Sequence, residues 1–257
     1  NSYSALHQWN VENKVALVTG GGRDIGKLIS LSLAAEKVSV AVNYNSSPKE
    51  AEETVSNIKK LGGNAKAYKG DISNYDEIKN TIQMINNDFG EIDFLINNAG
   101  YTRIERFIES KPEEWDKQID ICLKGSINCS HLVIEKMIEK KHGRIINIVG
   151  DSSRIGEANL AITAAARGGT ISLGKSLAKE LGRYSITVNT ISLGLVKTTH
   201  SNNEFLEKNM DKILKSYPLK RIGEADDVAP MVTFLCSSNA NWITGQVISI
   251  NGGFCMV

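Results

Sequence analysis

The stretch that decides the fold is Thr19-Gly20-Gly21-Gly22-Arg23-Asp24-Ile25-Gly26, which joins an apolar run to a segment with helical periodicity. Glycines allow the backbone to turn tightly and to approach a ligand closely. The start of a helix presents unpaired N–H groups with partial positive charge, which attract phosphate. A glycine-rich turn between a strand and a helix is typical of a dinucleotide-binding βαβ unit. We therefore expect this loop to hold a pyrophosphate.

Outside this loop, short β-branched runs alternate with longer segments of helical periodicity. The expected strands are 15–18, 38–43, 65–68, 94–97, 144–149, 187–192 and 247–250. The expected helices are 25–36, 48–61, 75–89, 115–139 and 157–181. The strands are nearly uninterrupted apolar runs, which is typical of a parallel sheet covered on both faces. This order predicts the α/β class, with a doubly wound, Rossmann-type parallel sheet and right-handed crossovers.

The chain has the size and composition of one domain. It contains 257 residues, of which only four are proline, and it has no Gly/Ser-rich linker. This length suits a single large α/β core. We expect one dinucleotide-binding domain over residues 1–257, with a helical insertion at about 195–218 after the sixth strand. In such folds the insertion after a strand end usually binds substrate.

Composition narrows the classes of partner. Lys plus Arg number 30 and Asp plus Glu number 29, so there is no electrostatic case for nucleic acid or an anionic membrane. The longest apolar runs are shorter than the roughly 20 residues that span a membrane. The first ten residues are polar and carry no signal-peptide core, and the cysteines show no metal-binding spacing. We expect a cytoplasmic protein with free thiols and without a metal.

Motifs along almost the whole chain resemble those of the short-chain dehydrogenase/reductase family, whose loop reads Thr-Gly-x-x-x-Gly-x-Gly. The further matches are Asp71, Asn97 to Gly100, Asn189, Gly194, Thr198, Arg221 to Gly223, Asp227 to Ala229, Ile243 to Gln246 and Asn251 to Gly253. Within the family the chain is most similar to 3-oxoacyl-(acyl carrier protein) reductases and related acyl-CoA dehydrogenases. The resemblance implies an NAD(P)-linked carbonyl or 3-oxoacyl reductase that takes a small-molecule or acyl-thioester ligand.

The resemblance also assigns cofactor contacts. The residues implied at the phosphates are Gly20, Ile25 and Gly26; at the adenine, Asp71 and Ile72; along the ribose and phosphates, Asn98, Ala99 and Gly100; and at the nicotinamide and its ribose, Arg167, Val196 and Thr198. An acid at the end of the second strand would accept hydrogen bonds from a ribose 2′-hydroxyl. Here Asn43 to Ser47 contain no acid, and Arg23 lies nearby. The charge pattern therefore favours NADP(H) over NAD(H).

Asp24 stands where the resemblance implies the second glycine of the loop. A carboxylate repels a pyrophosphate, and a side chain there obstructs close approach of the backbone. Asp is also a good N-cap for a helix that begins at Ile25. The two interpretations are compatible, and together they predict weakened cofactor binding on an intact fold.

The positions that the resemblance assigns to the catalytic groups carry other residues. The family uses a Tyr whose pKa is lowered by a Lys four residues later, with a Ser and an Asn that orient substrate and water. Local matches place these Asn, Ser, Tyr and Lys positions at Cys122, Gly150, Thr163 and Arg167. An aliphatic hydroxyl is a far weaker acid than a phenol, glycine has no side chain, and Arg does not carry protons. We expect the standard proton-transfer route to be absent, with Asp151 as a candidate substitute acid.

Three hypotheses about function stay open. The first is an oxidoreductase that keeps hydride transfer and takes its proton from another acid, from water or from the substrate. The second is a catalytically inactive homologue that binds a nucleotide or acyl ligand, and the third is a lyase, isomerase or cyclase on the same fold. Small residues within 157–181 let a second helix approach closely. Because the family usually associates through this helix, we expect a homodimer or homotetramer.

Overall fold

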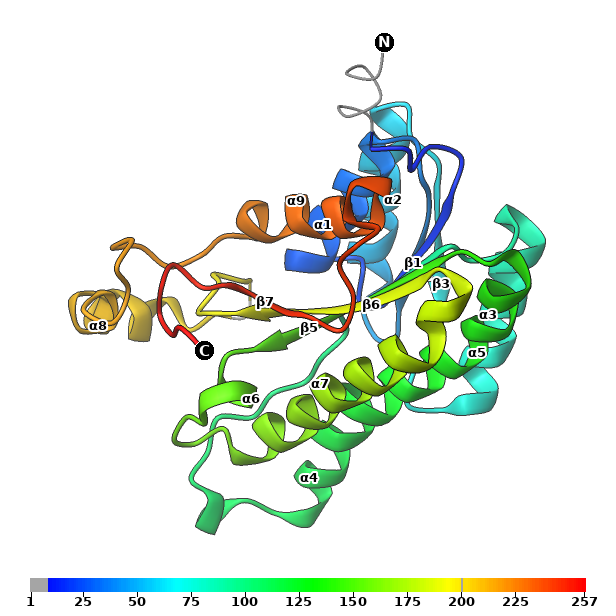
Figure 1. Ribbon diagram of the computed structural model, residues 1–257. Coiled ribbons are helices and arrows are strands. Elements are labelled where there is room, and N and C mark those ends of the chain that lie inside the picture. Colours follow the sequence, from blue (N-terminus) through cyan, green and yellow to red (C-terminus); the bar gives the residue numbers. More distant parts are fainter. Residues whose placement is uncertain (1–8, 200) are drawn as a thin grey trace.

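Seven parallel strands form one sheet at the centre of the computed structural model, which describes residues 9–199 and 201–257 (Figure 1). The strands are β1 (Val15–Val18), β2 (Ser39–Tyr44), β3 (Ala65–Lys69), β4 (Phe94–Asn97), β5 (Gly143–Gly150), β6 (Ile186–Leu193) and β7 (Val247–Ile250). Their order is β3-β2-β1-β4-β5-β6-β7, with every neighbouring pair parallel. The doubly wound sheet predicted from the sequence is therefore confirmed.

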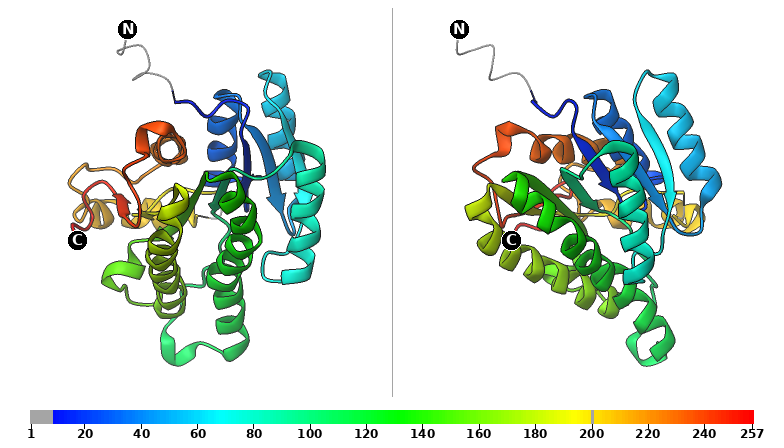
Figure 2. Two further views of the ribbon diagram at one scale, coloured as in Figure 1. Left: turned by 45° about the vertical axis from the view of Figure 1, so that its right-hand side comes forward. Right: turned by 90° about the vertical axis from the view of Figure 1, so that its right-hand side faces the viewer.

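Helices cover both faces of the sheet, as Figure 2 shows. One layer contains α1 (Asp24–Ala35), α2 (Pro48–Lys60) and α9 (Ala225–Cys236), and the other contains α3 (Tyr75–Phe89), α5 (Gly125–Lys140) and α7 (Ala161–Leu181). Side chains of a strand alternate between the faces, so β1 sends Ala16 and Val18 into the first core and Val15 and Leu17 into the second. Because both faces are buried, each strand needs apolar residues at successive positions.

Two expected helices differ from the observed ones. The helix expected at 115–139 is built from α4 (Pro112–Ile119) and α5, joined by a π-helical turn, Asp120–Lys124. The helix expected from residue 157 begins only at Ala161, and a short helix, α6 (Ser152–Ile155), precedes it. Gly156 has a φ of +71°, a left-handed conformation that ends α6.

The insertion expected near 195–218 contains one helix, α8 (Asn203–Leu214). Asn202 caps it by accepting a hydrogen bond from the N–H of Phe205 at 2.9 Å. In Figure 1, α8 lies beyond the carboxyl end of the sheet, apart from both helical layers.

Across residues 9–199 and 201–257, no helix is both long and apolar enough to cross a membrane. Residues 1–8, most of the polar segment behind the expectation of no signal peptide, lie outside the described residues.

Candidate active site

A cavity of about 900 Å³ lies at the carboxyl end of the sheet. Residues 148–152 and 193–196, at the ends of β5 and β6, line one side, and α8 contributes Phe205, Leu206 and Ile213. Ile25 and Asn98, which follow β1 and β4, also line it. The strand order reverses between β1 and β4. Open α/β sheets bind their ligands at such a reversal, so the fold itself selects this cavity as the candidate site.

The loop after β1 is bonded to the loop after β4. The Thr19 hydroxyl accepts hydrogen bonds from the N–H groups of Asn98 and Ala99, both at 3.0 Å. The Asn98 amide donates in return to the carbonyls of Thr19 at 3.1 Å and Gly20 at 3.2 Å. These bonds fix the start of α1 beside the end of β4.

Glycine is required in the phosphate loop for close packing. A side chain at Gly26 would collide with the Gly20 carbonyl, and one at Gly22 would come within 2.7 Å of the backbone of Ala51. Gly20 has a φ of +60°. Only residues without a Cβ adopt this arrangement freely, and the resulting compact turn fits a pyrophosphate at the start of α1.

Asp24 does not cap α1, contrary to one interpretation of the sequence. It is the first residue of the helix, with a φ of +50°, and its carboxylate accepts hydrogen bonds from Thr199. The backbone N–H of Thr199 donates at 2.7 Å and its hydroxyl at 3.0 Å. The phosphate loop is thereby bonded to the segment that follows β6.

The end of β2 carries no acid that could meet a ribose. Asn43 is buried, and its amide donates to the Gly70 carbonyl at 3.0 Å. Its side chain therefore links the end of β2 to the residue that follows β3. Arg23 is exposed, and its guanidinium bonds to no residue in the described part of the chain. A cation at this place is consistent with the expected preference for a 2′-phosphate.

Of the four positions assigned to catalytic groups, three line the cavity: Gly150, Thr163 and Arg167. The Thr163 hydroxyl lies 3.2 Å from the hydroxyl of Thr102, which also faces the cavity. Arg167 donates to the Ile148 carbonyl at 2.6 Å. Its guanidinium also lies against Gly100, where any side chain would collide with it.

Gly150 leaves room beside these residues. A Cβ at this position would meet only the Ser152 hydroxyl at 3.6 Å and the Leu193 carbonyl at 3.9 Å within 4 Å, which are ordinary contact distances. The position is therefore not constrained to glycine by packing.

Cys122 lies in the π-helical turn and does not line the cavity. Its buried thiol donates to the Tyr101 carbonyl at 3.3 Å, and its own carbonyl accepts from the Thr170 hydroxyl at 2.9 Å. Single π-helical turns are frequent at functional sites. Here the Thr170 hydroxyl of α7 donates to a carbonyl of the turn, which links α7 to the junction between α4 and α5.

Asp151 lines the cavity but its carboxylate is fully engaged. One oxygen accepts from the Ser192 hydroxyl at 2.6 Å and the other from the Asn251 amide at 2.7 Å. The geometry gives Asp151 a role in joining β5, β6 and the segment after β7, and its role as an acid remains a prediction.

Sequence reasoning missed a second carboxyl group at the cavity. Burial, together with the charge of Asp151, raises the pKa of Glu157, which lines the cavity in the loop after α6. Burial also raises the pKa of Tyr217, whose hydroxyl accepts from the N–H of Leu195 at 2.8 Å. Nothing in the local sequence marks these residues, because folding brings them to the cavity from separate loops.

The remaining predicted cofactor residues divide into two groups. Val196 and Thr198 line the cavity with Ile25, Asn98 and Arg167. Those that do not line it are Gly20, Arg23, Gly26, Asp71, Ile72, Ala99 and Gly100. Ile72 is buried against Gly125, and the Asp71 carboxylate accepts from the N–H of Ser73 at 2.9 Å. Their part in adenine binding stays a prediction.

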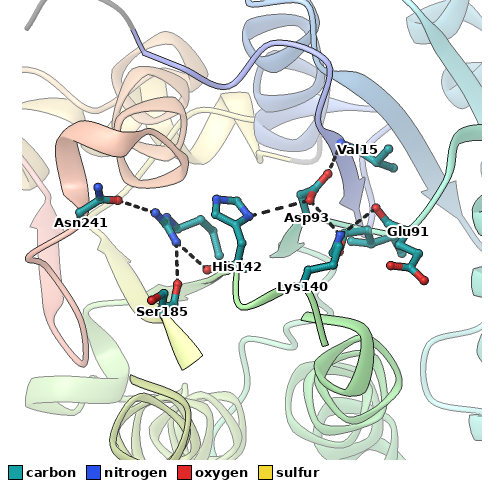
Figure 3. A network of polar contacts seen from close by, with 10 residues as sticks. Val15, Glu91, Asp93, Lys140, His142, Ser185 and Asn241 are labelled. Carbon is teal, nitrogen blue, oxygen red and sulfur yellow. Dashed lines mark hydrogen bonds and ion pairs between the residues drawn. The ribbon is translucent and has the colours of Figure 1, made fainter. Parts of the chain in front are cut away.

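A second polar cluster, the amino-edge network, lies at the opposite end of the strands. It contains Asp93, Lys140 and His142, which Figure 3 shows, and Arg144, which bonds to Asn241. Asp93 accepts from the N–H of Val15 at 2.9 Å and from Lys140 at 2.8 Å. Arg144 is only 4% exposed and donates to the side chain of Asn241 at 2.6 Å.

His142 is neutral within this network. Burial, with the nearby charges of Arg144 and Lys14, lowers its pKa to about 4. Its Nδ1 lies 3.8 Å from the Asp93 carboxylate, which alone would raise the pKa. Because the larger effects oppose protonation, the 3.8 Å contact is not an ion pair at neutral pH.

The thiols are all unpaired. Cys122, Cys129, Cys236 and Cys255 form no disulfide. Burial raises the pKa of Cys129 to about 12, so this thiol is unreactive. Among residues 9–199 and 201–257, no group of three His, Cys, Asp or Glu side chains is placed to hold a metal ion.

Comparison with known proteins defines the class. Residues 20–255 match the family described as Enoyl-(Acyl carrier protein) reductase. The chain is 42% identical over 247 residues to a 3-oxoacyl-[acyl-carrier-protein] reductase of Staphylococcus epidermidis, covering 95% of this chain and all of the relative. It is 39% identical over 243 residues to the corresponding reductase of Staphylococcus aureus, covering 95% of this chain and 98% of the relative.

Solved structures share the fold. A putative short-chain alcohol dehydrogenase from Sinorhizobium meliloti superposes with a TM-score of 0.91 at 28% identity, covering 96% of this chain and 98% of that one. A putative gluconate dehydrogenase from Agrobacterium tumefaciens superposes with a TM-score of 0.92 at 26% identity, covering 97% and 99%. The chain belongs to the short-chain dehydrogenase/reductase family. Within it, the chain is similar to 3-oxoacyl-[acyl-carrier-protein] reductases.

Proposed function

We propose that the cavity is the active site of an NADP(H)-dependent carbonyl reductase for 3-oxoacyl thioesters, with an atypical route for the proton. The observation that carries this proposal is the placement of Ile25, Asn98 and Thr198 on the same cavity as Thr163 and Arg167. By the family resemblance, the first three correspond to positions that bind a dinucleotide, and the last two to positions that carry the chemistry. When bound, a reduced nicotinamide supplies a hydride to the carbonyl carbon.

The residues around the loop support the choice of cofactor. The compact glycine turn at the start of α1 suits a diphosphate, and the exposed Arg23, which bonds to no other described residue, suits a 2′-phosphate. No acid follows β2 to select a free ribose hydroxyl. In our proposal Arg167, held by the Ile148 carbonyl, lies at the nicotinamide ribose.

The lining of the cavity supports an acyl ligand. Phe205, Leu206 and Ile213 present apolar side chains from α8, and Leu160 faces the same space. An acyl chain gains free energy by leaving water for such a surface. The curated relatives are named as reductases of 3-oxoacyl groups on an acyl carrier protein, which agrees with this ligand class.

In this proposal solvent delivers the proton to the substrate oxygen. The space beside Gly150 admits water or the substrate oxygen, and the hydroxyls of Thr163 and Thr102 can donate hydrogen bonds to it. The positive charge of Arg167 favours a developing alkoxide. Positioning the reactants retains much of the catalytic benefit even without a dedicated acid, so we expect slow turnover.

A second candidate function is a homologue that binds the same ligands without turnover. Gly150 supplies no side-chain donor, and the Asp24 carboxylate lies at the start of α1, where a diphosphate would bind. The first feature disfavours catalysis, and the second would weaken the binding of a dinucleotide.

We also propose a homodimer or homotetramer in the cytoplasm. The supporting features are the exposed apolar Ile127 on α5, the small residues of α7, and four thiols that form no disulfide.

One experiment separates these functions. NADPH and NADH are titrated into the protein by calorimetry, and nicotinamide absorbance and products are then followed with 3-oxoacyl thioesters. We expect tighter binding of NADPH and slow, stoichiometric formation of the 3-hydroxyacyl product. No binding of either nucleotide would overturn the reductase. Binding without turnover would favour the second candidate, and product formed without nicotinamide oxidation would indicate a lyase, isomerase or cyclase.

A further inference from the structure

Asp24 bonds two segments that are 175 residues apart in the sequence. Both carboxylate oxygens accept from Thr199, one from the N–H at 2.7 Å and the other from the hydroxyl at 3.0 Å. Hydrogen bonds to a charged acceptor are stronger than neutral ones. Thr199 follows directly on Thr198, which lines the cavity and whose N–H donates to the Ser201 hydroxyl at 2.8 Å. The contact therefore fixes one rim of the cavity to the phosphate loop.

The backbone at Asp24 is held in a conformation that costs free energy. Its φ of +50° lies in the left-handed region, which glycine adopts freely and other residues disfavour. An Asp side chain in a regular N-cap conformation would satisfy the helix instead. The chain thus accepts this conformation and directs the carboxylate away from α1 toward Thr199.

The contact places a negative charge at the start of α1. Asp24 directly precedes Ile25, a residue of the cavity lining. A helix start favours an anion, and here the protein supplies its own. Lys27, in the first turn of the helix, is bonded to Glu53 at 3.1 Å, and Asp24 forms no ion pair within the described residues. A diphosphate at the same helix start would lie beside this carboxylate.

We propose that Asp24 and Thr199 form a clasp that competes with the dinucleotide diphosphate, so that Asp24 sets the affinity of this chain for its cofactor. The inference rests on the proposed function, because it assumes that a dinucleotide binds at the phosphate loop. For a dinucleotide to bind, either its diphosphate lies beside the Asp24 carboxylate, or the carboxylate releases Thr199 and moves away. Asp24 is in this account a residue that lowers cofactor affinity, and it takes no part in the reaction.

The test compares Asp24→Asn, Asp24→Gly and Thr199→Val with the wild-type protein. Asn removes the charge, Gly also relieves the backbone, and Val removes only the hydroxyl donor while keeping the charge. The matched control is Asp76→Asn, which removes an exposed carboxylate from the first turn of α3, away from the cavity. Two quantities are measured: NADPH affinity by calorimetry, and amide hydrogen exchange of the segment between Gly194 and Thr199.

We expect Asp24→Asn to bind NADPH about tenfold more tightly and Asp24→Gly at least as tightly, because one like charge is removed beside the diphosphate. The gain should shrink as salt is added, since salt screens exposed charges. Thr199→Val should speed exchange of the segment with a smaller gain in affinity, and Asp76→Asn should change neither quantity. Equal or weaker NADPH binding by both Asp24 variants would overturn the competition.

Hydrogen exchange keeps the clasp testable if the proposed function fails. In the absence of nucleotide, the amide hydrogen of Thr199 should exchange faster in Asp24→Asn than in the wild-type protein. Unchanged exchange would overturn the clasp itself. If no variant binds NADPH or NADH, the proposed function and the competition both fall, whereas faster exchange would still establish the contact.

Discussion

At the amino edge of the sheet, Arg144 and Asp93 are charged, buried and bonded to fixed partners, whereas at the carboxyl edge small and hydroxyl-bearing residues face a cavity. Figure 3 shows the amino-edge network joining the starts of β1, β4 and β5 to α5. At the other edge, Gly150 has free space beside it.

This difference separates stability from ligand binding. Buried charges cost free energy unless every partner is present, so changes at the amino edge should act on folding. Residues that line a cavity make fewer packing contacts, so substitutions at the carboxyl edge should change ligand affinity more than the free energy of unfolding. The amino ends of the strands therefore contribute mainly to stability, and their carboxyl ends contribute mainly to ligand binding.

The largest effect is expected from restoring the family's groups at the carboxyl edge. In the variant Gly150→Ser/Thr163→Tyr/Arg167→Lys, a phenol beside a cation can again protonate the substrate oxygen. General acid catalysis contributes about 10²–10⁴-fold, so we expect the rate of NADPH oxidation with a 3-oxoacyl thioester to rise about a thousandfold. Gly168→Ala is the control on α7, where a Cβ meets only a carbonyl at 3.6 Å. No increase in a triple variant that is folded and binds NADPH would contradict the proposed atypical route.

At the amino edge, Asp93→Ala should lower the free energy of unfolding by about 3–5 kcal/mol. It removes the side-chain acceptor of the Val15 N–H and the only carboxylate partner of Lys140 within the described residues, which keeps just the carbonyls of Glu91 and Ile92. Urea denaturation measures the loss, and NADPH affinity well below the midpoint should not change. Glu91→Ala, at an exposed carboxylate nearby, should cost less than about 1 kcal/mol. A loss of NADPH affinity in folded Asp93→Ala would mean that the two edges are coupled.

The pH dependence of stability should carry a component from His142. Its pKa is about 4 in the folded chain against an ordinary value of 6.5, so the unfolded chain binds more protons between these values. The free energy of unfolding should therefore fall as the pH is lowered from about 6.5 to 4, by up to about 3 kcal/mol from this residue.

Denaturation of His142→Gln at several pH values checks this component, which the variant should lack. His131→Gln should retain it, because the ring of His131 lies at the exposed end of a contact with Tyr75. Identical pH profiles for the wild-type protein and His142→Gln would show that the ring is protonated normally in the folded chain.

The smallest effect is expected from Arg167→Met. This variant removes the cation that lies between the Ile148 carbonyl and Gly100, so NADPH affinity should fall about tenfold. Arg183→Met, near the amino end of β6, should leave the affinity unchanged. Equal affinities for both variants would exclude Arg167 from the cofactor site.

The sequence was sufficient for the sheet and for the loop after β1. Apolar runs such as Phe94–Asn97 identify buried parallel strands, and the glycines of the loop form a local motif, although the contacts that require Gly20 and Gly22 come from Ala99 and Ala51. The start of α7 was predicted four residues early, at Glu157 instead of Ala161. The observed start follows from the left-handed Gly156 and the short helix before it.

Contacts between distant segments were beyond prediction. The sequence gives Asp24 two local interpretations, whereas its partner Thr199 lies 175 residues away. Arg144 begins a strand in an apolar run, and only the assembled fold shows that its charge meets Asn241. Glu157 likewise reaches the cavity through the path of a loop. Local pattern determines the elements, and packing determines which polar groups they bring together.

Deuterium transfer tests most directly whether the carboxyl-edge cavity performs hydride transfer. The protein is incubated with a 3-oxoacyl thioester and NADPH carrying deuterium at both C4 positions, and the product is analysed by mass spectrometry. We predict a 3-hydroxyacyl product with one deuterium at C3, formed in step with oxidised nicotinamide. A product without deuterium, or bound NADPH that is never oxidised, would contradict a reductase at this site.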